Sequence, residues 1–142
     1  MLKVGKFVLA GALAFTGLAG ASFINTPSAQ AAEDPPASVY LEKGDIGVNS
    51  NRIIGKGQYG RFIMEVNKVT DATATVYKET GWFDEKVATL NISTDDCYRG
   101  KYGDTTNVYL DKGSEYYVKF SVLDLTAGGS ARLYNYNFPY NL

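Results

Sequence analysis

The segment Glu115–Leu123 is the part of this chain that most limits what it can fold into, because apolar and polar side chains alternate along it. Successive side chains of a β-strand point to opposite faces, so this period of two predicts a strand with one buried and one exposed face. The residues expected on the buried face are Tyr116, Val118, Phe120 and Val122.

Similar short segments occur along the whole chain after residue 37, separated by clusters of Gly and Asp. None of them shows a sustained apolar period of 3.6 residues. We therefore predict an all-β fold: a compact antiparallel β-sandwich, jelly-roll or Greek-key-like, of about seven or eight short strands. Residues 93–106 are expected to form a polar loop, and Trp82–Leu90 has a short helix as its alternative. The expected strands are Ser38–Glu42, Arg52–Ile54, Arg61–Val69, Thr73–Thr80, Lys86–Ile92, Asn107–Leu110, Glu115–Leu123 and Arg132–Phe138, the last with Tyr134, Tyr136 and Phe138 on the core side.

The first 31 residues have the three-part pattern of a secretory signal peptide. Lys3 and Lys6 precede an uncharged apolar run from Phe7 to Ala21, and Ala29-Gln30-Ala31 offers small residues at the cleavage site. The run is shorter than the roughly 20 apolar residues of a membrane span. We expect a bacterial, secreted protein in which residues 32–37 form a disordered leader and residues 38–142 a single domain, with no stable membrane insertion after cleavage.

Composition excludes several classes of function. The chain contains no histidine, which removes histidine-dependent triads and the common zinc sites. Beyond residue 31 it carries 12 basic and 15 acidic side chains, a net charge of −3 that argues against nucleic acid as a partner. Its one cysteine, Cys97, cannot form an internal disulfide, and we interpret it as a small buried side chain, with an intermolecular bridge or a reactive thiol as alternatives.

One local resemblance adds to this prediction. The segment Leu110–Val118, a strand followed by a glycine turn and a Tyr-Tyr-Val alternation, resembles the late strands of bacterial pre-peptidase C-terminal domains. Those domains are small secreted β-sandwiches that accompany secreted enzymes without being catalytic. The resemblance therefore implies a non-catalytic accessory role, although the Asp-rich early strand typical of that family has no counterpart here.

Aromatic residues are the strongest feature of the composition, with 11 Tyr, 7 Phe and one Trp. A tyrosine combines a broad apolar face with a polar tip, which suits binding surfaces. Trp82 follows Gly81 in an expected turn, and Tyr98 and Tyr102 fall in the expected loop. We predict these three residues as ligand-binding, with simple coverage of the sandwich as the alternative.

Acidic residues suggest two further kinds of site, a calcium site and a pair of catalytic carboxylates. Asp95, Asp96 and Asp104 lie in the expected loop and could supply oxygen ligands to calcium, although their spacing does not match a known calcium loop. Otherwise we expect no cofactor. Among the strand glutamates that could act in pairs, Glu65 alternates with apolar residues as an outward-facing position does.

The sequence therefore favours a small secreted, non-catalytic binding protein. Its expected partner is a carbohydrate, a cell-wall polymer or an extracellular protein, contacted through exposed aromatic side chains. The alternatives are a bacteriocin-like toxin or an enzyme inhibitor, and then a small hydrolase.

Overall fold

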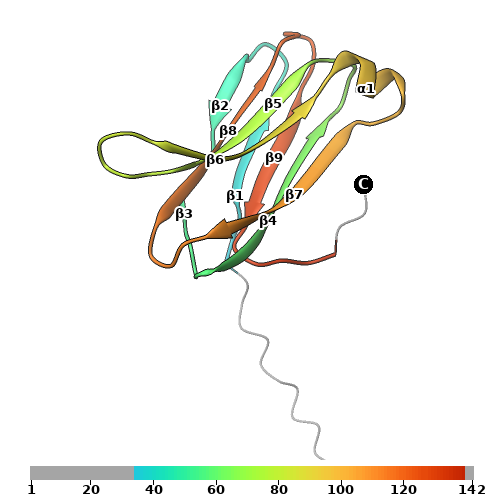
Figure 1. Cartoon of the computed structure of the whole chain (residues 1–142). Coiled ribbons are helices and arrows are strands. Elements are labelled where there is room, and N and C mark those ends of the chain that lie inside the picture. The colour runs from blue at the N-terminus through green and yellow to red at the C-terminus, as the bar shows by residue number, and fades with distance from the viewer. Residues whose placement is uncertain (1–33, 140–142) are drawn as a thin grey trace, which may run out of the picture. The chain divides into compact units, whose positions relative to one another are not determined.

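A computed structural model describes residues 34–139, and the expected signal peptide, residues 1–31, lies outside the described part. The described residues all belong to one compact unit. Nine β-strands and one short helix follow one another along it (Figure 1). They are β1 (Ala37–Leu41), β2 (Gly47–Asn49), β3 (Ile53–Ile54), β4 (Gln58–Val66), β5 (Ala72–Lys78), β6 (Glu85–Ile92), α1 (Thr94–Tyr98), β7 (Gly103–Leu110), β8 (Glu115–Val122) and β9 (Gly129–Tyr134).

The strands form two antiparallel sheets, which confirms the predicted sandwich. Sheet A has the order β1-β9-β4-β7, and sheet B has the order β2-β8-β5-β6 with the short β3 also paired to β8. Without β3, the eight remaining strands follow the 1-8-3-6 and 2-7-4-5 order of a jelly roll. Neighbours within a sheet are thus mostly distant in sequence, and β1 pairs with β9 from Ala37↔Leu133 to Leu41↔Gly129.

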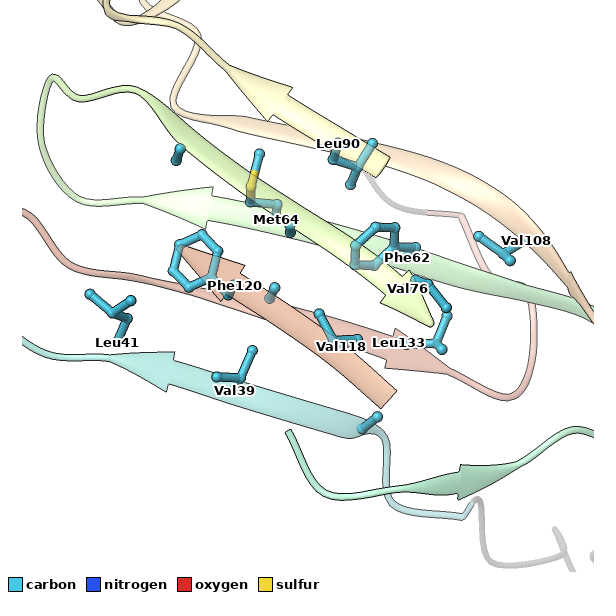
Figure 2. Close-up of a cluster of buried hydrophobic side chains, with 14 of the residues drawn as sticks. Val39, Leu41, Phe62, Met64, Val76, Leu90, Val108, Val118, Phe120 and Leu133 are labelled. Carbon is cyan, nitrogen blue, oxygen red and sulfur yellow. The ribbon is translucent and has the colours of Figure 1, made fainter. Parts of the chain in front are cut away.

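The core lies between the two sheets and is built from the alternating faces that the sequence predicts (Figure 2). In β8 the four predicted inward residues are all buried, and in β4 the alternate positions Phe62, Met64 and Val66 are buried as well. Cys97 is the buried residue of α1 and belongs to the same apolar cluster. Its Sγ lies 3.7 Å from the carbonyl oxygen of Thr70.

The sequence prediction does not include β2, and it differs from the structure at three further places. Residues 93–106 are not a loop: they contain α1 and the first half of β7. The last strand ends at Tyr134, and Ala131 and Leu133 are the buried residues that face the core. Tyr134 therefore lies on the opposite face, where its ring contacts those of Tyr136 and Phe138 with centroids 5.5 and 4.8 Å away.

The expected leader, residues 32–37, is the third difference. Ala37 already pairs with Leu133 as the first residue of β1. The carbonyl oxygen of Pro36 accepts a hydrogen bond from Asn51 Nδ2 at 3.3 Å, and Asp34 forms an ion pair with Lys56. Residues 34–37 are thus held against the sandwich rather than disordered.

Candidate functional site

One register row crosses the outer face of sheet A near the end of β4. Tyr40 of β1 lies opposite Ser130 of β9, Ser130 lies opposite Glu65 of β4, and Glu65 lies opposite Gly103 of β7. The neighbours of Tyr40 in β1 are buried in the core, so Tyr40 points outward and is 67% exposed. The row spans three strand spacings, which is about 14 Å.

Two shallow hollows, of about 570 and 540 Å³, open along this row, and both are lined by Glu65 and Val66. The first extends toward β1 and also has Tyr40 in its lining; the second extends toward β7 and has Tyr102. Space remains here because the positions beside Glu65 carry small or no side chains. These small residues are Gly128, Gly129 and Ser130 in the first hollow and Gly100 and Gly103 in the second. We call the two hollows together the trough.

Hydrogen bonds tie both walls of the trough to the end of β4. Val66 donates its N–H to the carbonyl oxygen of Tyr102 at 2.8 Å. On the other side, Asn67 holds Gly128 twice: its N–H donates to the carbonyl oxygen of Gly128 at 3.0 Å, and its Oδ1 accepts from the N–H of Gly128 at 2.9 Å. Two backbone hydrogen bonds and the side chain of Asn67, which itself lines the first hollow, therefore fix the walls of the trough.

Charged groups of both signs line the trough. Glu65 is ion-paired with Arg132, which lies two residues after Ser130 in β9 and so on the same face of sheet A. Glu42 and Lys43 border the first hollow, and Arg99 and Lys101 border the second. Lys101 Nζ lies 3.5 Å from a carboxylate oxygen of Asp104. The trough thus presents hydrogen-bond donors and acceptors together and is not a site for one sign of charge.

The structure separates the three predicted ligand-binding aromatics. Tyr102 lines the trough. Tyr98, at the end of α1, is 76% exposed but is not part of the trough lining. Trp82 lies beyond the opposite end of β6, whose eight residues extend over about 25 Å. The two ends are visible in Figure 1, where α1 and the β5–β6 hairpin point away from each other.

Two of the three aspartates predicted for calcium have another partner in the structure. Asp96 completes the capping box at the start of α1, where a carboxylate oxygen accepts from Ser93 N and Oγ at 3.0 and 2.7 Å. These hydrogen bonds from Ser93 lower the pKa of Asp96. Asp104 contacts Lys101, and Asp95 is exposed. Within residues 34–139, no group of three His, Cys, Asp or Glu side chains could hold a metal ion.

The β5–β6 hairpin carries the most exposed aromatic residues of the described chain, Trp82 at 91% and Phe83 at 83%. Its base is fixed to β8 by Tyr117. The Tyr117 hydroxyl donates to a carboxylate oxygen of Asp84 at 2.6 Å, and its ring stacks on that of Tyr77 with centroids 5.4 Å apart. The hydrogen bond to Asp84, burial and the negative charge of Asp84 together raise the pKa of Tyr117 to about 12.

This raised pKa predicts a change in stability at alkaline pH. The folded state holds the phenol proton more tightly than the unfolded chain does, so the stabilisation is complete below about pH 10 and is lost as the pH rises through about 12. Urea unfolding at pH 8 and pH 11.5 should show a larger loss of stability for the wild type than for Tyr117→Phe. An identical loss in both proteins would contradict the assignment.

Sequence reasoning missed two residues of the trough, Tyr40 and Glu65. The alternation of Val39 and Leu41 already placed Tyr40 outward, and Glu65 was recognised as an outward position. What the sequence lacked was the strand order that brings them into one row.

In residues 34–139 no helix is long and apolar enough to cross a membrane.

No protein-family model matches the chain, and no curated protein matches it. Among solved structures, the crystal structure of the Yersinia pseudotuberculosis-derived mitogen aligns with a TM-score of 0.42 and 12% sequence identity, over 76% of this chain and 92% of that one. A likeness of this size assigns no function to the chain.

Proposed function

We propose that this chain is a small, secreted, non-catalytic binding protein that recognises an extracellular glycan, such as a cell-wall polymer, in the trough. The observation that carries this proposal is the register row from Tyr40 through Glu65 to Gly103, with hollows on both sides of Glu65. An open, shallow trough on a sheet face suits a ligand that lies along the surface.

The chemistry of the trough matches that of sugars. A sugar ring has an apolar C–H face that can lie on a tyrosine ring, and hydroxyl groups at its edge that both donate and accept hydrogen bonds. Tyr40 and Tyr102 stand at the two sides of the trough, with exposed fractions of 67% and 41%. Glu65 between them can accept hydrogen bonds, and Lys43 and Lys101 at the borders can donate them. The distance of about 14 Å across the row suits a short oligosaccharide segment.

The ion pair between Glu65 and Arg132 supports a binding role rather than a hydrolytic one. Glycoside hydrolysis usually requires two carboxyl groups facing each other across the bond that breaks. The other carboxyl group of the trough belongs to Glu42, which borders only the first hollow, whereas Glu79 and Glu115 lie at the β5 and β8 ends of sheet B.

A matched pair of tyrosine substitutions tests the proposal. Residues 32–142 should be retained on an insoluble polysaccharide such as chitin or cellulose, or on peptidoglycan. Tyr102→Ala should weaken this retention about five- to tenfold, since an aromatic stacking contact is worth about 1–1.4 kcal/mol. Tyr98→Ala is the control, because Tyr98 lies at the same end of the sandwich but outside the trough. Binding isotherms on the retained polymer measure both effects.

Two results would decide against the proposal. One is equal weakening by Tyr98→Ala and Tyr102→Ala, which would place the contact on the helix end. The other is no retention on any polymer.

Repeating the measurement with calcium and with a chelator tests the separate prediction for Asp95, Asp96 and Asp104. Loss of binding in chelator alone would support a metal ion at the α1 end of the sandwich.

A further inference from the structure

The tip of the β5–β6 hairpin is a second surface that the trough does not explain. Trp82 and Phe83 follow Gly81, which has a positive φ of 87° and open space around it. Both aromatic side chains are almost fully exposed, and Figure 1 shows this hairpin projecting beyond the two sheets. Large adjacent apolar side chains held in water at the end of a projection are typical of an interaction surface.

The flanks of the hairpin are fastened to the body of the sandwich. Arg52 donates two hydrogen bonds to the carboxylate of Glu79, at 2.6 and 3.1 Å, and Lys78 Nζ lies 2.8 Å from Asp111. On the other flank Asp84 is bound by Tyr117. These contacts occupy Lys78, Glu79 and Asp84 and direct their charges toward the sandwich, whereas Glu85 and Lys86 at the start of β6 are exposed. The residues on both sides of the uncharged segment Gly81-Trp82-Phe83 are therefore fixed to the sandwich, which lowers the entropic cost of binding.

The size and shape of the tip limit what it can bind. Two aromatic side chains bury about 150–250 Å² each, whereas a stable protein interface buries about 800 Å² on each partner. The hairpin projects from the sandwich (Figure 1), and a charged residue lies on each of its flanks, Glu79 before the tip and Asp84 after it. A lipid bilayer needs no complementary shape, and its interfacial layer accepts Trp side chains readily.

We propose that Trp82 and Phe83 dock this protein reversibly in the interfacial layer of a lipid bilayer. This contact is independent of the glycan proposal, because the tip and the trough lie at opposite ends of β6. It also differs from stable insertion, since two side chains from one hairpin reach only the headgroup and upper acyl region.

The charges predict which bilayers the tip prefers. Residues 78–86 contain two lysines and three acidic residues, and the chain beyond residue 31 has a net charge of −3. Docking should therefore occur on neutral phosphatidylcholine vesicles and should change little with salt. A polybasic segment, in contrast, requires anionic lipid and is released by salt.

Trp82 is the chain's single tryptophan, so its fluorescence reports on the tip alone. Adding phosphatidylcholine vesicles to residues 32–142 should shift the emission maximum to shorter wavelength, and lipids brominated in the upper acyl chain should quench it. Phe83→Ser should reduce the vesicle affinity about tenfold, the effect of losing one buried aromatic side chain. Tyr98→Ser, which removes an exposed aromatic residue elsewhere, should leave the affinity unchanged.

Three outcomes would overturn the proposal. The first is an emission maximum that stays unchanged with vesicles. The second is a shift that needs added phosphatidylserine and disappears in high salt, because charge rather than the aromatic tip would then drive binding. The third is a shift with soluble polysaccharide but not with vesicles, which would assign the tip to glycan. Polymer retention that is lost in Tyr102→Ala but intact in Phe83→Ser shows that the trough works independently of the tip.

Discussion

Replacing Phe120 with alanine should lower the free energy of unfolding by about 3–5 kcal/mol, the usual cost of removing a buried aromatic ring. Phe120 is fully buried in β8, where it lies between Val48 of β2 and Ala74 of β5 in register. It belongs to the apolar cluster between the sheets, together with residues of both (Figure 2). Its neighbour Ala74 is small and cannot fill the space that the ring would leave.

This loss is a large fraction of the total stability of about 5–15 kcal/mol expected for such a domain. Urea unfolding followed by circular dichroism measures it directly. Leu123→Ala is the matched control: Leu123 is 77% exposed just after the same strand, so its truncation should change stability by less than about 0.5 kcal/mol. If the two variants were equally stable, the core would not lie on the predicted face of β8.

Adding a single methyl group at Gly129 should disturb both the fold and the trough. A Cβ at this position would lie 2.3 Å from the carbonyl oxygen of Glu65 and 3.0 Å from Phe120 Cζ. The first of these atoms belongs to the backbone of β4, so β4 and β9 must separate where Glu65 lines both hollows. Gly129→Ala should therefore cost about 1–3 kcal/mol of stability, the usual effect of overpacking, and should also weaken polymer retention.

Gly47→Ala provides the comparison for this effect. A Cβ at Gly47 would meet its nearest atoms at 3.5 and 3.6 Å, which are ordinary contacts. Because alanine also reduces the freedom of the unfolded chain, Gly47→Ala should be neutral or stabilising by up to about 1 kcal/mol. Equal melting temperatures for the two variants would show that β9 does not approach β4 as closely as the structure indicates.

The sequence predicts individual strands well where one face is apolar throughout. In β8 and in the second half of β4 the alternation identifies the inward residues correctly, because every second position there carries a large apolar side chain. In β9 the inward positions are Ala131 and Leu133, whereas the larger rings follow with the opposite parity. The aromatic pattern therefore led to the wrong face and to a strand that was too long.

The helix and the trough were harder to predict for different reasons. The helix α1 has only five residues, too few to show a period, although the Ser93–Asp96 capping box was a readable signal for its start. The trough depends on Tyr40 and Tyr102 standing on either side of Glu65, which follows only from the strand order of sheet A. Tyr102 could be predicted from its residue type, but its neighbours could not.

The pairing of β1 with β9 has a consequence for the order in which the chain can fold. Ala37, near the start of the domain, has as its partner Leu133, near the end. Sheet A therefore cannot be completed until almost the entire chain is free, and such distant pairing slows folding. A chain that emerges with its N-terminus first therefore remains unfolded until its last strand is available. This fits transport through a narrow channel before folding, the export route that the predicted signal peptide implies.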